Sequence, residues 1–461
     1  MAHRIRAGLR PFLIRSFLLG AFKMDLLHGN VKQAYWKYFS AAFGSALISS
    51  IYYIVDTAVV GQYQGPEGTA ALAVVAPIWN LIYSLGLLTG IGGAVLCSTS
   101  AGKGEEDKRQ EYFSAALLLT AFLGLLSWGI VSLFQTPLLR FFGAEETLLP
   151  IAQEYIRPIL FVLPLFTVNQ MLAAFLRNDN DPGRATAAVI IGSVFNIIAD
   201  IVFVFPMNMG VFGAGLATAM GSALTTVLML PHFRSVKNTF HLRRPTRIFH
   251  KLGQILATGF PTFIVDAAMG ILTILFNRQI VHWLGTDALA VYGVVVNIST
   301  IVQSCSYSAG EAAQPIISIN FGAGYGGRIR ETLQQALCTV AFFSLAWTAV
   351  VWLFPNGFIR VFMDATPAVL EIAPAIMRAY GISFLLLPLN IFSTFYFQAI
   401  LRPFTALGVS VFRGLLVSGA LILLLPALLG ANALWFAMPI TELIVGVPVI
   451  LLTLRSARSM Q

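Results

Sequence analysis

Charged residues are scarce in this sequence. Asp, Glu, Lys and Arg make up 11% of its 461 residues, whereas ordinary globular proteins carry about 25%. Hydrophobic residues account for 57% of the chain, and a soluble protein of this length could not bury so much apolar surface. The composition therefore excludes a soluble protein. The net charge of +9 comes mainly from loops, so it indicates orientation in a membrane, and we expect no nucleic-acid partner.

Cysteine and histidine are also rare. Cys97, Cys305 and Cys338 each lie inside an apolar run, which excludes a disulfide framework or a CxxC metal motif. None of the six histidines lies deep in an apolar run. The glycine-rich piece from 322 to 327 lacks the Lys-Ser/Thr of a phosphate-binding loop. We therefore expect that the protein has no cofactor and no catalytic residues, and that it is not an enzyme.

Long apolar runs are what the sequence has in abundance. Twelve of them are long enough to cross a bilayer, which takes about 20 helical residues. They predict an all-α integral membrane protein with twelve transmembrane helices. The expected spans are 38–61, 71–99, 112–134, 152–176, 184–205, 212–232, 253–282, 289–319, 332–354, 370–400, 404–425 and 431–454.

The basic residues indicate the orientation of these spans. Under the twelve-span scheme, 24 of the 29 Lys and Arg residues fall on the side that holds both termini. The positive-inside rule then places both termini in the cytoplasm of a multi-pass cell (inner or plasma) membrane protein. Residues 1–37 are expected to form a cytoplasmic N-terminal extension, with Met24 as an alternative start, and no signal peptide is expected.

The chain divides into two similar halves. A basic cytoplasmic linker, 233–252, separates a six-helix lobe at 38–232 from a second at 253–454, and 455–461 form a cytoplasmic tail. Gly68-Thr-Ala-Ala-Leu-Ala-Val74 recurs as Gly285-Thr-Asp-Ala-Leu-Ala-Val291, an offset of 217 residues. Six spans in each half predict two parallel repeats with a cavity between them, an organisation typical of alternating-access carriers.

Five acidic residues lie deep in the expected spans, where an ionisable group is costly and by default marks a function. They are Asp56, Asp200, Asp266, Glu311 and Glu442. In the first half, Asp56, Asp200 and Thr218 all lie about six residues, or roughly 9 Å, below the expected outer surface. Asn196 is one turn deeper, on the same helical face as Asp200.

These four side chains from three helices are expected to converge on a coupling-cation site. Oxygen ligands suit Na⁺, so Asp56, Asn196 and Asp200 are also a candidate Na⁺ site, and no other metal site is expected. Two neighbouring carboxylates would equally well share a proton. The residues therefore leave open whether the coupling ion is H⁺ or Na⁺.

The second half differs from the first, because its counterpart of span 184–205 carries Arg413 and no acid. Its own acids are Asp266 in span 253–282 and Glu311 in span 289–319, and Pro315 weakens the helix beside Glu311. Glu311 and Gln314 share the piece Gly310-Glu-Ala-Ala-Gln-Pro315. We predict that Asp266, Glu311 and Gln314 bind a cationic substrate.

Several pieces resemble the multidrug and toxin extrusion (MATE) family, especially its MepA-like branch. They are Val55-Asp-Thr-Ala-Val-Val-Gly61, Phe175-Leu-Arg-Asn-Asp179, Phe195-Asn-Ile-Ile-Ala-Asp200 and Gln314-Pro-Ile-Ile-Ser-Ile-Asn-Phe-Gly-Ala323. The resemblance covers about residues 24–455. It implies two six-helix lobes forming a V and efflux of organic cations by antiport with H⁺ or Na⁺. It also implies a cation site at Asp56, Asn196, Asp200 and Thr218, and acidic substrate positions at Asp266 and Glu311.

Three other functions stay open at this point. A flippase or exporter of lipid-linked sugars or other metabolites from the same superfamily would be expected to carry more basic residues in its cavity. An intramembrane enzyme would need a reactive His, Ser/His or acid pair near a water-accessible opening. A channel would lack saturable transport against a gradient. For the carrier, the expected partners are small organic cations and membrane lipids, and the expected state is a monomer.

Overall fold

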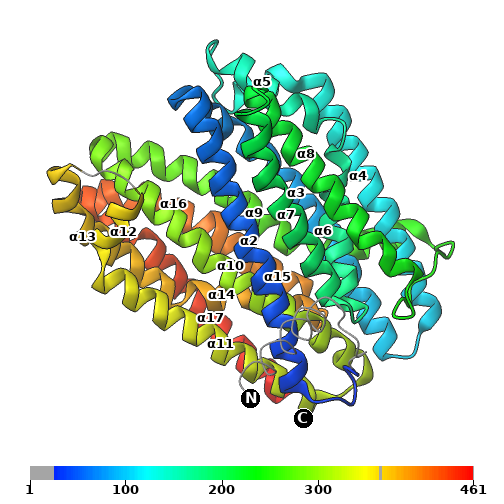
Figure 1. Cartoon of the computed structure of the whole chain (residues 1–461). Helices are drawn as coiled ribbons and strands as arrows, with labels where there is room; N and C mark the ends of the chain where they lie inside the picture. The colour runs from blue at the N-terminus through cyan, green and yellow to red at the C-terminus, as the bar shows by residue number, and fades with distance from the viewer. Residues whose placement is uncertain (1–24, 363–365, 460–461) are drawn as a thin grey trace, which may run out of the picture. The chain divides into compact units, whose positions relative to one another are not determined.

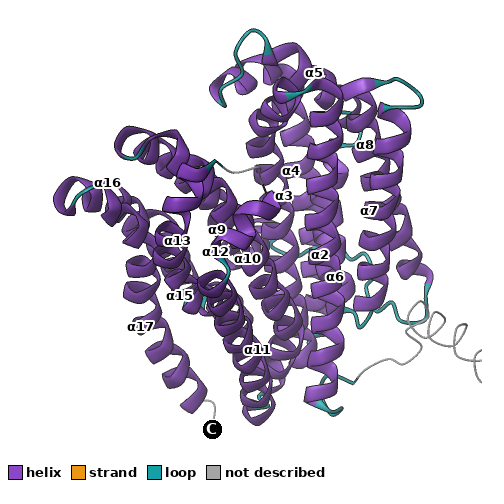
Figure 2. Ribbon diagram, turned by 60° about the vertical axis from the view of Figure 1, so that its left-hand side comes forward, coloured by secondary structure: helices purple, strands orange, loops and turns teal. Residues whose placement is uncertain are grey.

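The computed structural model describes residues 25–362 and 366–459. Within these ranges the regular secondary structure is all helical, with loops between the helices and no strand (Figure 2). This confirms the predicted all-α membrane fold. Most of the predicted N-terminal extension, including the alternative start Met24, and the last two residues of the predicted tail lie outside the described residues.

The spans match the prediction closely. Eleven described helices are long and apolar enough to cross a membrane, and a bent pair, α5 (Leu148–Ile159) and α6 (Leu163–Asn178), makes a twelfth when counted as one span. The two members of this pair meet at 58°. Pro158 inside α5 and Pro164 in the first turn of α6 remove backbone donors on both sides of the break. Prolines thus account for a bend that apolar length alone could not predict.

The described chain forms two compact units, and the first consists mainly of Ser40–Leu256. Its helices pack as a bundle, coloured blue to green in Figure 1. Besides α5 and α6, they are most of α2 (Val31–Gln64), α3 (Pro66–Gly102), α4 (Glu106–Phe141), α7 (Pro182–Val204), α8 (Gly210–Met229) and the short η1 (Leu230–Arg234).

The second unit consists of Ala257–Gln461 together with Val31–Phe39 from the start of α2. Its helices run from green to red in Figure 1. They are most of α9 (Ile248–Trp283), α10 (Gly285–Ala323), α11 (Gly326–Leu353), α12 (Pro355–Phe362), α13 (Pro367–Gly381), η2 (Ile382–Leu385), α14 (Leu387–Ala399), α15 (Pro403–Val411), η3 (Phe412–Leu416), α16 (Val417–Leu429), η4 (Ala431–Phe436) and α17 (Ala437–Arg458). The domain boundaries expected from the sequence stay a prediction.

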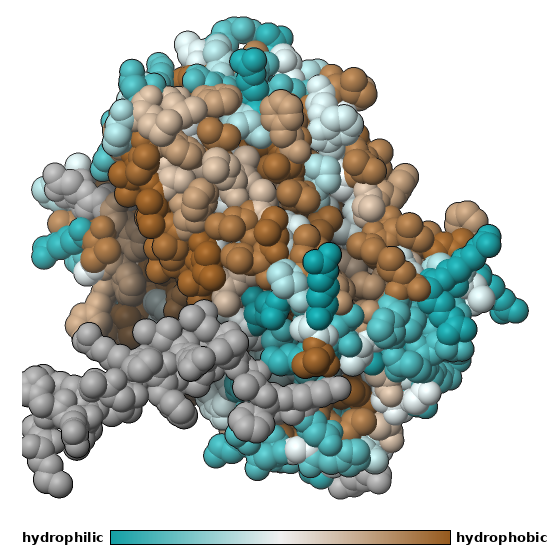
Figure 3. Space-filling model, turned by 45° about the vertical axis from the view of Figure 1, so that its right-hand side comes forward, coloured by the Kyte–Doolittle hydropathy of each residue, from teal (hydrophilic) through white to brown (hydrophobic). Residues whose placement is uncertain are grey.

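Large hydrophobic side chains cover outward faces of the helices. On α4, Phe122 is 61% and Leu133 78% exposed. Figure 3 shows hydrophobic residues across the middle of the visible face and hydrophilic residues gathered toward its ends. Such a surface is unfavourable in water and favourable against lipid tails. The burial pattern therefore agrees with a chain that sits in a bilayer.

Glycines bring the helices of the first unit into close contact. A β-carbon at Gly215 of α8 would lie 2.1 Å from the backbone oxygen of Tyr155 on α5. Where α7 and α8 cross, a β-carbon at Gly221 would lie 3.0 Å from the oxygen of Gly192. Small residues at such crossings let backbones approach closely in membranes. These two contacts hold α5 and α7 against α8 at the level of the predicted cation site.

The segment that follows η1 is anchored to the first unit. Phe240 is 3% exposed and stacks on Phe113 of α4 with ring centroids 4.6 Å apart. Farther along, Lys251 forms an ion pair of 2.9 Å with Glu111 of α4. The composition of this segment predicts a polar, basic linker, and the structure adds that much of it is packed in place.

A buried histidine secures the beginning of this segment. His232 is fully buried, with Nε2 2.8 Å from Asp179 and Nδ1 3.1 Å from Asp181. Because carboxylates only accept hydrogen bonds, both ring nitrogens are donors here. Burial alone would raise the pKa of Asp181, but hydrogen bonds from His232 and Lys237 lower that pKa to about 2. Asp181 therefore stays ionised at neutral pH.

Candidate functional site

The four residues predicted to bind the coupling cation lie together in the first unit. Asp56 on α2, Asn196 and Asp200 on α7 are each at most 3% exposed, and Thr218 on α8 is half-buried. The Asn196 amide lies 3.2 Å from the Thr218 hydroxyl. With its oxygen toward Thr218, the amide accepts from the Thr218 backbone N–H at 3.1 Å and donates to Asp200 Oδ2 at 3.3 Å.

Tyr155 on α5 completes this group, although the sequence did not single it out. Its hydroxyl donates to Asp56 Oδ2 at 2.7 Å and lies 3.4 Å from the Thr218 hydroxyl. Polar contacts therefore run from Asp56 through Tyr155, Thr218 and Asn196 to Asp200. We call these five residues the acidic cluster.

The sequence does place Tyr155 and Thr218 at a similar depth, because both expected spans, 152–176 and 212–232, start at the outer surface. An aromatic residue in an apolar run is more often a packing residue, so the depth alone did not single it out.

The acidic cluster is suited to a small cation. Asp56 Oδ1 and Asp200 Oδ1 are buried and have no hydrogen-bond partner among the described residues. Within the same part of the chain, no basic side chain forms an ion pair with either carboxylate. A buried charge without compensation is costly. Protonation of a carboxylate, or Na⁺ held by these oxygens, would remove that cost.

The predicted substrate residues lie in the second unit. Asp266 on α9 is partly buried, and the Tyr307 hydroxyl of α10 donates to its Oδ1 at 2.5 Å. Glu311 and Gln314 follow Tyr307 by four and seven residues, so all three share one face of α10. Gln314 is 4% exposed and donates to Ser318 at 3.3 Å. The structure thus links Asp266 to the α10 face that carries Glu311, through Tyr307.

The fifth deep acid, Glu442 on α17, has a basic partner. Arg413 Nε donates to Glu442 Oε1 at 2.8 Å, and both side chains are more than nine-tenths buried. Asn390 of α14 donates to Glu442 Oε2 at 2.6 Å and to its backbone oxygen at 3.0 Å. The count of 24 basic residues on the side of the termini includes Arg413. Because Arg413 is buried inside the span Pro403–Leu429, it does not belong in that count. The imbalance that remains is still large.

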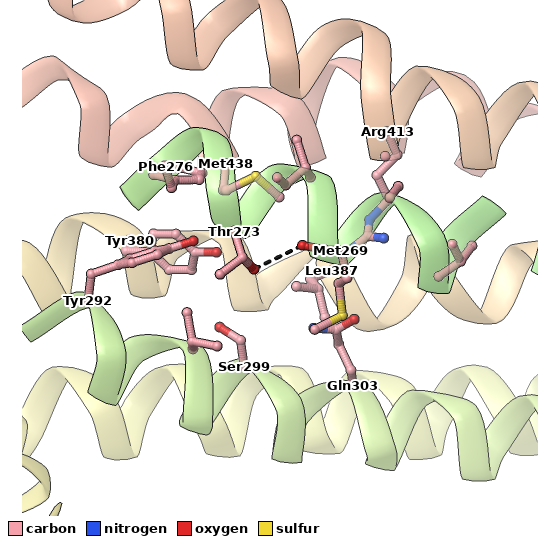
Figure 4. A pocket seen from close by; sticks show the side chains of 15 residues that line it. Met269, Thr273, Phe276, Tyr292, Ser299, Gln303, Tyr380, Leu387, Arg413 and Met438 are labelled. Carbon is pink, nitrogen blue, oxygen red and sulfur yellow. Dashed lines mark hydrogen bonds between the residues drawn. The ribbon is translucent and has the colours of Figure 1, made fainter. Parts of the chain in front are cut away.

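A pocket of about 50 Å³ lies beside this ion pair (Figure 4). Helices α9, α10, α13, α14 and α17 and the turn η3 contribute to its wall. Arg413 reaches into it from one side, and Tyr292 and Tyr380 line the opposite side. Its volume is room for a few water molecules. The wall also includes Gln303, whose buried Oε1 has no hydrogen-bond partner among the described residues.

Comparisons with known proteins agree on one family. The family model described as MatE matches residues 41–202 and 261–421, most of the chain. The multidrug export protein MepA of Staphylococcus aureus (strain NCTC 8325 / PS 47) is 22% identical over 400 residues, 86% of this chain and 87% of that protein. The probable multidrug resistance protein YoeA of Bacillus subtilis (strain 168) is also 22% identical, over 69% of this chain and 71% of its own length.

Solved structures show the same fold. One, described as the outward-facing conformation of a multidrug resistance MATE family transporter of the MOP superfamily, has a TM-score of 0.86 at 20% identity, covering 95% of this chain and 98% of that chain. A second, described as MATE in complex with MaL6, has a TM-score of 0.85 at 21% identity, with coverages of 94% and 98%. With the helical spans already established and the MatE family model matched in both halves, the chain belongs to the MATE family of multidrug efflux transporters.

Proposed function

We propose that this transporter exports organic cations by antiport with H⁺ or Na⁺. The observation that carries this proposal is the acidic cluster, which buries two carboxylates without a basic partner among the described residues. Such a site gains most from binding a small cation. The names of the similar proteins MepA and YoeA, which refer to multidrug export and resistance, support a drug-like cargo.

Coupling requires the cation to bind one conformation better than another, because only differential affinity shifts an equilibrium between states. When a cation neutralises the acidic cluster, Asp56 and Asp200 no longer repel each other, and α2 and α7 can repack against α5 and α8. We propose that this repacking favours release of the cargo. Loss of the cation restores the charged state, which then binds cargo again.

The cargo is proposed to bind through Asp266, Glu311 and Gln314 of the second unit. Both acids are partly buried, so their charge acts through a medium of lower dielectric constant than water and attracts cations strongly. The Tyr307 hydroxyl orients Asp266 by a hydrogen bond of 2.5 Å. A neutral cargo would gain no such attraction, so the site favours cations.

The proposed location is the cell membrane, with both termini in the cytoplasm and the chain acting as a monomer. The side chain of His241, in the linker, is exposed. A cysteine placed there, with Cys338 replaced by Ser, should react with a membrane-impermeant maleimide only after the cells are opened. Labelling in intact cells would reverse the orientation.

One transport experiment tests the proposal. The purified protein in liposomes should move a fluorescent organic cation against its gradient when a proton gradient or a sodium gradient is imposed. Each gradient is applied alone, so the response identifies the coupling ion. Liposomes that contain the Asp200→Asn variant serve as the control. Absence of movement with both gradients, from correctly inserted wild-type protein, would refute the antiport.

A further inference from the structure

The second unit holds a buried positive charge at a place where the first unit holds none. Arg413 is 7% exposed and lies on the π-helical turn Phe412–Leu416, in the middle of a membrane span. Turns of this type are uncommon and often occur at functional sites. A buried guanidinium is costly unless it is paired, and its partner is Glu442, 2.8 Å away.

The carboxylate of Glu442 is fully satisfied within the chain. Arg413 donates to one oxygen and Asn390 to the other. In the acidic cluster, by contrast, Asp56 and Asp200 each keep one buried oxygen without a partner among the described residues. Glu442 therefore has little to gain from an additional cation, whereas the two aspartates have much to gain.

The sequence repeat relates the two places. Ser193-Val-Phe-Asn196 in α7 recurs as Ser410-Val-Phe-Arg413, at the offset of 217 residues that also relates Gly68–Val74 to Gly285–Val291. Both pieces lie in the fifth span of their half. Counted from the proline that begins each span, Arg413 lies one helical turn before the position of Asn196. The guanidinium in one half and the amide of the cation site in the other thus lie within one helical turn of equivalent positions.

We propose that Arg413 is a built-in cation. In the second unit it fills the role that an exchangeable H⁺ or Na⁺ has in the first, and it neutralises Glu442 permanently. The second unit then binds no coupling cation, and each transport cycle exchanges cations only at the acidic cluster. This inference rests on the proposed antiport and adds that only one of the two units is coupled to the ion.

The pocket beside Arg413 and Glu442 provides a way to test this role by binding of a small ion. Truncation of Arg413 leaves Glu442 with an uncompensated charge and enlarges a pocket that already measures about 50 Å³. Gln303 Oε1 adds a buried hydrogen-bond acceptor on the pocket wall. A free guanidinium ion carries the same planar set of donors as the lost side chain. The Arg413→Ala protein should therefore bind guanidinium.

Binding can be measured without transport. Guanidinium chloride at about 10 mM, far below denaturing concentrations, should raise the melting temperature of Arg413→Ala by a few degrees. An equal concentration of tetramethylammonium chloride is the control for ionic strength. Wild type and Arg413→Ala/Glu442→Gln should show no such shift, because the first retains its own guanidinium and the second lacks the carboxylate. An equal shift in all three proteins, or none in Arg413→Ala, would overturn the inference.

Efflux from liposomes tests the same inference when Arg413→Ala fails to fold. Arg413→Gln/Glu442→Gln removes both charges together, so no buried charge is left alone, and it should keep at least half of the wild-type efflux. Loss as complete as in Asp200→Asn, in correctly inserted protein, would show that Glu442 exchanges a coupling cation and would overturn the inference. If wild type itself shows no ion-driven efflux, the proposed antiport fails, and the guanidinium measurement still decides the role of Arg413.

Discussion

The two units of this transporter bury acids in opposite electrostatic settings. In the first unit, Asp56 and Asp200 belong to a cluster of neutral polar groups with no basic partner among the described residues. In the second, Glu442 is held by Arg413 and Asn390. A carboxylate whose counter-charge is tethered contributes to structure, and one whose counter-charge must arrive from solution can sense an ion gradient. In this way one of two duplicated halves can bind the coupling ion while the other holds a permanent ion pair.

The largest expected effect on transport is that of Asp200→Asn in the first unit. This change preserves the shape of the side chain and fixes it in the neutral state, so binding of the cation no longer changes the charge of α7. Gradient-driven efflux from liposomes should fall by at least about 100-fold, the loss that follows when an interaction of about 2.7 kcal/mol is removed. Binding of cargo should persist, as measured by fluorescence anisotropy. Normal pumping by folded, inserted protein would show that the acidic cluster is not the coupling site.

Substitution of the buried acid should lower thermal stability more in the second unit than in the first. Glu442→Gln leaves the buried guanidinium of Arg413 without its partner, and breaking a buried pair in this way typically costs about 3–5 kcal/mol. Asp200→Asn removes a charge that has no basic partner, so it should not lower stability. Thermal unfolding of both variants in the same detergent measures the difference. Equal melting temperatures would mean that the ion pair contributes nothing to the fold of the second unit.

Tyr155→Phe should have an intermediate effect. The substitution removes the hydrogen bond of 2.7 Å to Asp56, and a bond to a charged group is worth about 1.5–3 kcal/mol. We expect gradient-driven efflux to slow about tenfold, with unchanged maximal binding of cargo. Tyr63→Phe is a matched control, because Tyr63 is 40% exposed and bonds to Asn208 at 3.3 Å, outside the cluster. Equal slowing by both changes would remove Tyr155 from the site.

The smallest expected effect is that of Glu311→Gln on transport of a cationic substrate, which we propose binds in the second unit. Glu311→Gln removes one negative charge from the face shared by Tyr307, Glu311 and Gln314. Transport of a cationic substrate should fall about fivefold relative to a neutral one, which corresponds to about 1 kcal/mol. Glu331→Gln, on an exposed side chain of α11, is the control. Equal losses for cationic and neutral substrates would assign Glu311 a structural role.

Much of the fold follows from the sequence. The spans could be predicted because a bilayer requires about 20 apolar residues per helix, and apolar length is a local property. The pairing of Asn196 with Asp200 could also be predicted, since residues four apart share a helical face. The similar depth of Asp56, Asp200 and Thr218 in their spans predicted that they lie at one level, and the family resemblance agreed. The structure places these residues and Asn196 together.

Other features depend on which helices meet. Tyr155 belongs to the cluster because Gly215 lets α5 approach α8 closely, and a single sequence does not show that contact. Arg413 and Glu442 are 29 residues apart on different helices, so neither could be recognised as half of a pair. The burial of Phe240 was hidden for a similar reason, because the composition of the segment 233–252 is that of a polar linker. In each case the missing information was a long-range contact.

The claim that coupling cations exchange only in the first unit is tested most directly by counting the cations released when cargo binds. Cargo is added to purified protein in weakly buffered solution, with proton release followed by an indicator dye and Na⁺ release by equilibrium dialysis. Because linkage is reciprocal, cargo that is expelled by a cation must expel that cation in turn. Wild type and Arg413→Gln/Glu442→Gln should release the same number of cations, and Asp200→Asn should release none. Release that persists in Asp200→Asn, or that disappears in the double variant, would contradict coupling through the first unit alone.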